Sequence, residues 1–311
     1  MRAVFFGTPE IAVPALVALT EIATVTAVIC QPDRPAGRGL ELKPPAVKQK
    51  AIELGLAVEQ PTKVRTPEFA AWLRDQSADV AVVIAYGRIL PAAVLAAPRR
   101  GCLNLHASIL PKYRGAAPIT WAIVEGETVT GVSLMQMDEG MDTGPVFIVR
   151  EVPIGPDDTA GDLAVALAAC AADVVRRDVP GAVAGALSAT PQDESRATHA
   201  RLLEKSDGRV RWDQPARRVH DHVRGMSPWP GAFTTTGDKT LKVLETRMAE
   251  GDAGAPPGTV VVAKKDRIEV ACAEGRVAVR RAQLEGKKPL GAADLTSGRV
   301  IAEGARLGGD P

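Results

Sequence analysis

The sequence contains a single asparagine, and it lies two positions before one of only four histidines. These residues, Asn104 and His106, fall in a stretch of alternating apolar and polar side chains that predicts a strand over 102–107. Residues i and i+2 of a strand point to the same face, so the amide and the imidazole are expected to reach one spot. An amide donor beside a group that titrates near neutrality suits a reaction in which a carbonyl oxygen gains charge. The alternative is a pair at the end of a strand that only bonds to the backbone.

Two further polar segments follow this strand. The segment 108–119 is rich in turn-forming residues and precedes a helix expected from about Ile119. The acidic turn 138–142 contains Asp142, whose carboxylate would favour the protonated form of His106 and fix its tautomer if the two lie close together. The alternative is that Asp138 and Asp142 only form turns, as aspartate commonly does.

The elements that must carry these groups alternate between short apolar runs and helical patterns over the first two-thirds of the chain. Strands separated by helices need crossover connections, so we expect an α/β fold with a mostly parallel sheet. Such sheets bind ligands beyond the carboxyl ends of their strands, which is where Asn104 and His106 lie. The expected strands are Ala3–Gly7, Val25–Cys30, Val80–Tyr86 and Cys102–Ala107, and the expected helices are Glu10–Glu21, Ala46–Gly55 and Pro67–Gln76.

Motifs and composition exclude several classes of protein. The turn after the first expected strand, Gly7-Thr8-Pro9, lacks the GxGxxG spacing, and no GxxxxGK[ST] occurs, which argues against a dinucleotide cofactor and an NTPase. The four cysteines are far apart and predict reduced thiols in a cytoplasmic protein, without disulfides or a zinc site. The apolar run at the start is too short for a signal peptide, and the Ala-rich stretch 163–175 predicts a packed helix and no membrane partner.

After residue 128 the pattern changes. Val129–Met137 and Val146–Pro153 predict an antiparallel hairpin, and Thr159 to Asp162 has the pattern of a capping box that opens the long Ala-rich helix. The polar stretch 190–206 is interpreted as a linker between a domain over 1–189 and a second domain over 207–311. The second domain is expected to begin with a helix near Pro215–Arg224.

Short strands separated by Gly/Pro turns predict a small, OB-like β-barrel in that second domain. Residues 1–206 carry 20 basic and 23 acidic side chains (−3), and residues 207–311 carry 18 and 14 (+4). This asymmetry is a weak indication of a polyanionic partner, and plain solvated surface is the alternative. The expected strands are Val210–Trp212, Gly231–Thr236, Leu241–Thr246, Gly258–Ala263, Ile268–Cys272 and Arg276–Arg280.

Two long motifs identify a family. The run Asn104-Leu-His-Ala-Ser-Ile-Leu-Pro-Lys-Tyr-Arg-Gly-Ala-Ala-Pro-Ile119 resembles the signature of the folate-dependent formyltransferases, and Met137-Asp-Glu-Gly-Met-Asp-Thr-Gly144 resembles its second half. Within that superfamily the chain is similar, over nearly its whole length, to the branch that formylates methionyl-tRNA. The supporting segments are Phe6–Pro9, Gln31–Gly39, Ala85–Gly87, Thr130–Val132 and Ser227–Pro230.

The resemblance implies a Rossmann-like catalytic domain that transfers a formyl group from 10-formyltetrahydrofolate, a cosubstrate, to the amino group of initiator methionyl-tRNA in translation initiation. It implies that Asn104 and His106 donate to the tetrahedral oxyanion, that Asp142 keeps His106 charged, and that no metal is needed. The folate is expected between the turn 138–144 and two loops, which contain Ser108, Ile109, Leu110 and Pro111, and Tyr86, Gly87 and Ile89.

The loop Gln31–Pro45 follows the second expected strand and is therefore expected at the same edge of the sheet. Its basic residues, Arg34, Arg38 and Lys43, suit an RNA acceptor end, whose phosphates dominate affinity. The family often has adjacent lysines just after this Gly-Arg-Gly, but here Leu40-Glu41 follow, so Arg38 is the first choice for an RNA contact. The C-terminal barrel is expected to hold the acceptor stem.

Three other functions stay open from the sequence. A formyltransferase could act on a small amine, such as glycinamide ribonucleotide or an amino sugar nucleotide, with the same three polar residues. A hydrolase could use them on water to release formate, and a non-catalytic RNA-binding protein could retain only the scaffold. Nothing in the pattern demands a dimer, so a monomer is expected.

Overall fold

The computed structural model describes residues 1–36, 41–252, 254–298 and 300–308. The chain forms two compact units. The first comprises residues 1–118, 129–153 and 164–201, and the second comprises 119–128, 154–163 and 202–311. The second unit therefore includes two segments that precede the linker expected at 190–206, and the expected domain limits stay a prediction.

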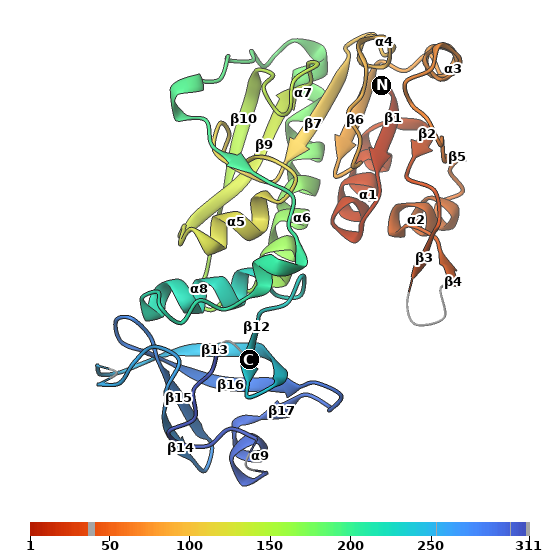
Figure 1. Ribbon diagram of the computed structural model, residues 1–311. Helices are drawn as coiled ribbons and strands as arrows, with labels where there is room; N and C mark the ends of the chain where they lie inside the picture. The colour runs from red at the N-terminus through yellow and green to blue at the C-terminus, as the bar shows by residue number, and fades with distance from the viewer. Residues whose placement is uncertain (37–40, 253, 299, 309–311) are drawn as a thin grey trace. The chain divides into compact units, whose positions relative to one another are not determined.

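The first unit is built on a seven-stranded sheet with the order β10-β9-β7-β6-β1-β2-β5 (Figure 1). The strands from β5 to β7 are parallel, and β9 and β10 extend the sheet in the antiparallel sense. This arrangement confirms the mostly parallel sheet and the hairpin predicted from the sequence. The strands are β1 (Arg2–Gly7), β2 (Thr24–Ile29), β5 (Val58–Glu59), β6 (Val80–Ile84), β7 (Cys102–His106), β9 (Val129–Gln136) and β10 (Val146–Pro153).

The helices expected in the first part of the chain are present, with small differences at their ends. The first begins as a 3-10 turn because Pro9 caps it and Pro14 lies in the first turn of α1. In α6, Thr159 Oγ1 accepts from the Asp162 N–H at 3.2 Å and Asp162 Oδ2 accepts from the Thr159 N–H at 3.0 Å, so the capping box is present. The helices are η1 (Glu10–Ala12), α1 (Val13–Ile22), α2 (Ala46–Glu53), α3 (Pro67–Asp75), α4 (Ala92–Leu95), α6 (Ala160–Arg177) and α7 (Val179–Ala184).

The central strands β1, β6 and β7 are buried along nearly their whole length, and most of the cysteines lie in the interior of the two units. Cys30, Cys102 and Cys272 are buried free thiols, and Cys170 is half-buried. Burial raises the pKa of Cys30 to about 11 and the pKa values of Cys102 and Cys272 to about 12. These groups are therefore neutral thiols near pH 7.

The segment expected as a loop over 31–45 contains a short hairpin, with β3 (Arg34–Ala36) paired to β4 (Glu41–Lys43). It lies beside α2 (Figure 1). Its base is held by Asp33, which accepts from Lys48 Nζ at 2.8 Å and from Gln60 Nε2 at 2.7 Å. Arg38, the residue expected first at the RNA, lies outside the described residues.

The second unit contains an antiparallel sheet with the order β12-β13-β16-β15-β14, with β17 paired to β16. The segment 305–308 joins its two edges, because Leu307 N donates to Gly258 O beside β14 and Gly308 N donates to Thr235 O in β12. The sheet is thereby closed, as expected for a small barrel. Its elements are β12 (Phe233–Thr236), β13 (Lys239–Ala249), β14 (Val260–Lys264), β15 (Arg267–Ala271), β16 (Arg276–Leu284), β17 (Leu290–Gly291) and α9 (Ala292–Ser297).

The prediction of a strand over Val210–Trp212 was wrong. Only Arg209 forms a bridge, to Phe233, and the chain then turns where Gln214 N donates to Arg211 O. Trp212 is nevertheless buried, with its indole N–H bonded to Thr234 Oγ1 at 3.0 Å. The apolar side chain of Trp212 therefore packs against β12, and Trp212 does not belong to a strand of its own.

Helix α8 (Ala216–Gly225) contributes a buried polar network to the second unit. Asp221 is fully buried and accepts from Arg217 Nε at 2.9 Å and Arg224 Nε at 2.7 Å. His220 lies between Thr246 Oγ1 and the carbonyl of Pro156, at 2.9 and 3.0 Å. Burial lowers the pKa values of His220 and His222 below the usual histidine range.

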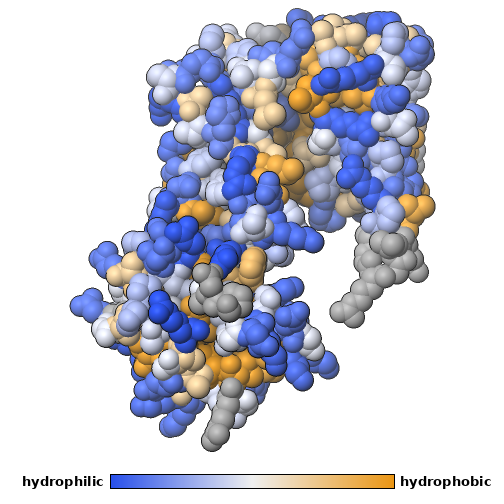
Figure 2. All heavy atoms as spheres, in the orientation of Figure 1, coloured by the Kyte–Doolittle hydropathy of each residue, from blue (hydrophilic) through white to orange (hydrophobic). Residues whose placement is uncertain are grey.

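The surface drawn in Figure 2 is largely hydrophilic on each unit, with apolar residues in separate patches. In the part of the chain that the structure describes, no helix is both long and apolar enough to cross a bilayer.

Candidate active site

Strand β7 places Asn104 and His106 on one face of the sheet, and both side chains reach Asp142. The two residues are almost fully buried, with 8% and 6% of their surface exposed. Asn104 Nδ2 lies 3.3 Å from Asp142 Oδ1, and His106 Nδ1 lies 3.5 Å from Asp142 Oδ2. The amide, the ring and the carboxylate therefore converge, as strand alternation predicted for Asn104 and His106 and as the resemblance implied for Asp142.

The protonation pattern of His106 follows from its second contact. Its Nε2 lies 2.9 Å from the carbonyl oxygen of Tyr113, which can only accept, so Nε2 carries a hydrogen. The other ring nitrogen, Nδ1, faces Asp142. Both ring nitrogens thus have protein partners, whereas the resemblance implied that His106 donates directly to the substrate.

Asp142 is held in an uncommon backbone conformation, with φ of +54°. Its Oδ2 accepts from the main-chain N–H of Gly115 at 2.9 Å. Gly115 belongs to β8 (Arg114–Gly115), which pairs with β11 (His199–Ala200), and a Cβ there would lie 2.7 Å from the Ala200 carbonyl oxygen. Only glycine allows this approach, so the N–H that orients the carboxylate depends on it.

Asp138, the other acidic residue of the turn, has a local role. Its Oδ1 accepts from Gly140 N at 3.0 Å and from Thr143 Oγ1 at 2.8 Å. These are contacts within the turn itself, so for this residue the turn-forming alternative from the sequence is the one that the contacts favour.

The loop over Ser108, Ile109, Leu110 and Pro111 is fixed by hydroxyl groups. Ser108 is fully buried and its Oγ donates to the Lys112 carbonyl at 2.6 Å. Ser133 Oγ, on β9, donates to Ser108 O and accepts from Leu110 N. Because the Ser108 hydroxyl is already used, its loop can offer a ligand main-chain groups and apolar side chains.

The second loop expected to contact the folate begins where β6 ends at Ile84. The Tyr86 ring packs edge-to-face on Phe6, with 5.1 Å between ring centroids, and its buried hydroxyl has no partner among the described residues. Burial raises the pKa of Tyr86 to about 12. Tyr86 can therefore meet a ligand only through its main chain, whereas Gly87 has a φ of +82° and Ile89 is half exposed.

Residues in the expected linker also reach this site, and sequence reasoning missed them. Gln192 Nε2 donates to the carbonyls of Asp142 and Gly144, at 2.8 and 2.7 Å. Arg114 donates to Gln192 Oε1 and forms an ion pair with Glu194 at 2.7 Å. The only signal in the sequence was Arg114 within the first motif, since nothing in 190–206 indicates that it folds back.

The expected RNA-binding residues of the hairpin are exposed where the structure describes them. Arg34 and Lys43 lie directly opposite each other across β3 and β4, and both are exposed. Two cations side by side on a short hairpin repel one another unless an anion lies between them. The hairpin therefore presents two neighbouring positive charges on its surface.

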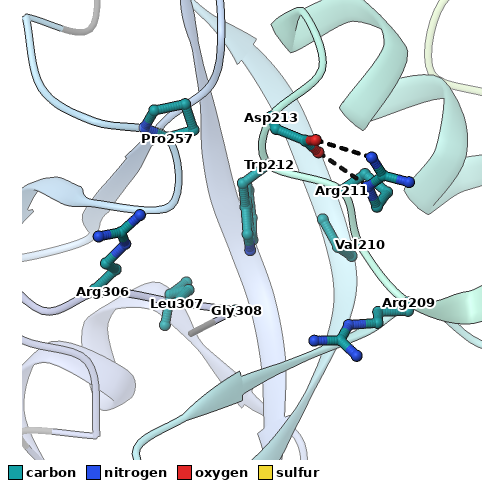
Figure 3. A pocket seen from close by; sticks show the side chains of 9 residues that line it. All are labelled: Arg209, Val210, Arg211, Trp212, Asp213, Pro257, Arg306, Leu307 and Gly308. Atoms are coloured by element: carbon teal, nitrogen blue, oxygen red, sulfur yellow. Dashed lines mark hydrogen bonds and ion pairs between the residues drawn. The ribbon is translucent and has the colours of Figure 1, made fainter. Parts of the chain in front are cut away.

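The second unit has an open groove of about 760 Å³ beside the segment that closes its sheet. Figure 3 shows Arg209 and Arg306 on opposite sides of Trp212, while Arg211 turns to Asp213, its ion-pair partner at 2.9 Å. Of the three arginines at this groove, Arg211 therefore has its charge balanced by an acidic neighbour within the second unit. Its lining residues are Arg209, Val210, Arg211, Trp212, Asp213, Pro257, Arg306, Leu307 and Gly308.

Comparisons with known proteins show the family to which the chain belongs. The formyl transferase family model matches residues 1–177, and the model of the formyl transferase C-terminal domain matches 202–300. The methionyl-tRNA formyltransferase of Sorangium cellulosum is 66% identical over 310 residues, which cover 99% of this chain and 100% of that protein. The enzyme of the same name from Myxococcus xanthus is 48% identical over 305 residues, or 98% of this chain and 97% of that protein.

Among solved structures, the N-formyltransferase from Helicobacter canadensis, in complex with folinic acid and dTDP-3-aminofucose, is similar with a TM-score of 0.68. The match covers 89% of this chain and 98% of that one, at 17% identity, and shows a shared fold. Together with the near-complete match to the bacterial enzymes, these similarities show that the chain belongs to the formyl transferases, in the family of the methionyl-tRNA formyltransferases.

Proposed function

We propose that this protein transfers the formyl group of 10-formyltetrahydrofolate to the amino group of initiator methionyl-tRNA. The observation that carries the proposal is the convergence of Asn104, His106 and Asp142 in a chain 66% identical to a methionyl-tRNA formyltransferase. As an enzyme of translation initiation it is expected to work in the cytoplasm. A monomer would give a mass of 32.6 kDa by light scattering.

The reaction forms a bond between the acceptor nitrogen and the formyl carbon and breaks the bond between that carbon and the folate nitrogen. In between, the formyl oxygen carries negative charge. The Asn104 amide has two hydrogens, one of which faces Asp142, so the second can be donated to that oxygen. Losing one donor of this kind costs about 3 kcal/mol of transition-state stabilisation.

One proton must also move from the acceptor amine to the leaving nitrogen. The Asp142 carboxylate is the acidic group at the centre of the site, and it stabilises positive charge on His106 through Nδ1. The pair can take the proton from the amine, directly or through water, and return it to the folate. The ring stays oriented throughout because Nε2 is bonded to Tyr113 O.

The folate is proposed to lie against the loop 108–111 and the turn that carries Asp142. Main-chain groups of Gly87 and of this loop would bind the polar edge of its ring, and the exposed side chains of Ile89 and Met141 would cover its face. The tRNA is proposed to contact the β3–β4 hairpin, with Arg34, Arg38 and Lys43 on its phosphates, and the groove beside Arg306.

Formylation of charged initiator tRNA with 10-formyltetrahydrofolate as donor is the direct test. Single-turnover rates for Asn104→Ala and Asp142→Ala should fall by roughly 10²–10³-fold while tRNA binding persists. Formylation of glycinamide ribonucleotide or an amino sugar nucleotide, but not of the charged tRNA, would overturn the choice of acceptor. Formate release without transfer would instead indicate the hydrolase.

The RNA contacts can be tested separately. Arg38→Ala and Arg34→Ala should weaken tRNA use with little change in folate affinity, whereas Arg74→Ala, on α3 in the same unit, should change neither. Arg306→Ala should remove one phosphate contact. The slope of log K for tRNA binding against log salt concentration should then decrease in magnitude by about 1. If these variants lose folate binding and tRNA binding equally, the proposed role of the hairpin residues in binding RNA is wrong.

A further inference from the structure

We propose that Gln192 is a positioning residue for formyl transfer, holding the turn that carries Asp142 through main-chain hydrogen bonds. The inference rests on the proposed function of this site. Gln192 touches none of the three polar side chains, and its effect would be transmitted by the backbone of the turn.

The contacts of Gln192 use both hydrogens of its amide. One is donated to the carbonyl of Asp142 at 2.8 Å and the other to the carbonyl of Gly144 at 2.7 Å. On its other side the turn is packed tightly, since a Cβ on Gly144 would lie 1.9 Å from the Gln136 carbonyl oxygen. The turn is thus fixed between Gln136 and Gln192, and Asp142 keeps its left-handed conformation between them.

The orientation of the Gln192 amide is set by Arg114. Its guanidinium, which can only donate, gives hydrogen bonds from Nε and one terminal nitrogen to Gln192 Oε1 at 3.0 and 2.9 Å. This leaves the Gln192 NH2 group facing the two carbonyls. Arg114 is itself 2% exposed and is anchored by two hydrogen bonds to Glu194.

Arg114 and the next residue, Gly115, therefore hold Asp142 at two points. Arg114 acts on the main chain through Gln192, and the N–H of Gly115 binds the carboxylate at 2.9 Å. With both ends fixed, the carboxylate has one position relative to His106 and Asn104. A displacement of about 1 Å in such a site can cost on the order of 10²-fold in rate, which is why a residue outside the polar trio matters.

Gln192→Glu separates this role from simple folding. Glutamate keeps the length of the side chain and an acceptor for Arg114, but it places a carboxylate oxygen where the NH2 group met two carbonyls. We expect the single-turnover rate of formyl transfer to fall by roughly 10- to 100-fold, with KM values for both substrates within about threefold of wild type. The pH dependence of the rate should also change, because the step that moves the proton from the amine no longer has a carboxylate in a fixed position.

The matched control is Gln76→Glu, whose amide donates to the Trp72 carbonyl at 3.3 Å far along the chain from the site. It should retain the wild-type rate and pH profile. Hydrogen exchange of amides 138–144 gives a readout independent of chemistry and should accelerate in Gln192→Glu alone. If that variant unfolds, Gln192→Met removes the donors without adding charge and should show the same acceleration and loss of rate.

If the Gln192 variants keep the rate, the pH profile and the hydrogen exchange of the wild type, the positioning role is overturned. A wild-type protein that fails to formylate charged tRNA would overturn the proposed function instead. In that case the exchange of the turn still decides whether Gln192 holds Asp142.

Discussion

The main-chain N–H of Gly115 donates a 2.9 Å hydrogen bond to the Asp142 carboxylate. The oxygen that accepts it, Oδ2, also lies 3.5 Å from His106 Nδ1, whereas Oδ1 faces the Asn104 amide. Each carboxylate oxygen therefore has its own set of partners. A change that preserves the shape of Asp142 but alters its charge should disturb all of them.

Asp142→Asn makes that change. An asparagine can still accept from Gly115 N, but its NH2 group would then face the Asn104 amide, and it cannot stabilise an imidazolium. We expect single-turnover formylation to fall by roughly 10²-fold or more. Asp173→Asn, which alters a solvent-exposed ion pair on α6, should retain the rate. A near-normal rate for Asp142→Asn would contradict a catalytic role for the carboxylate.

Gly144→Ala should destabilise the first unit. The added methyl group would meet the Gln136 carbonyl oxygen at 1.9 Å, and a backbone atom cannot move aside cheaply. Overpacking of this kind costs about 1–3 kcal/mol, measurable as a loss in the free energy of unfolding in urea. Gly291→Ala is the comparison, because a Cβ there meets nothing within 4 Å. Equal stabilities of the two variants would refute the close approach.

The buried histidines of α8 predict a pH dependence of stability. Burial lowers the pKa values of His220 and His222, although Asp157, 3.2 Å from the His220 ring, opposes the shift. Below about pH 6.5 the unfolded chain binds protons that the folded chain does not, so the free energy of unfolding decreases as pH falls. Each ring adds a slope of at most about 1.4 kcal/mol per pH unit.

Urea unfolding at pH 7.5 and 5.5 measures this difference. His220→Gln should lower stability at the higher pH but reduce the change between the two values. The exposed His199, replaced by glutamine, should leave that change as in wild type. An unchanged difference in His220→Gln would mean that the ring binds protons equally in the folded and unfolded chains, so that burial does not lower its pKa.

The capping box of α6 is expected to contribute to stability but not to activity. Thr159→Ala removes the hydroxyl that accepts from Asp162 N and donates to its carboxylate. The free energy of unfolding should fall by about 1 kcal/mol, with formylation unchanged. Thr128→Ala, at an exposed threonine, should change neither quantity, and an equal loss there would argue against the cap.

Much of the first unit was predictable because local patterns and packing agree in it. Val146–Pro153 has the bounds expected for it, and the parallel strands β1 and β6 are continuous apolar runs. The proximity of Asn104 and His106 follows from strand geometry. The position of Asp142 beside them needed the family resemblance, since a turn formed by residues distant in sequence has no local signature.

The predictions from local patterns were incomplete where contacts between residues distant in sequence decide the structure. The polar stretch 190–206 has the composition of a linker, but Gln192 and β11 are bonded to the active-site loops. The Tyr86 ring completes the core against Phe6, so the contact expected between Tyr86 and a ligand, which stays a prediction, is left to its main chain. Composition cannot distinguish these outcomes.

The raised pKa values of the cysteine thiols have a practical consequence. Alkylating reagents attack the thiolate, which Cys30, Cys102 and Cys272 scarcely form near neutral pH. Replacing the half-buried Cys170 alone should leave a protein in which a newly introduced cysteine takes up a maleimide dye selectively. Fluorescent reporters could then be attached to the hairpin or to the second unit without removing the interior sulfur atoms.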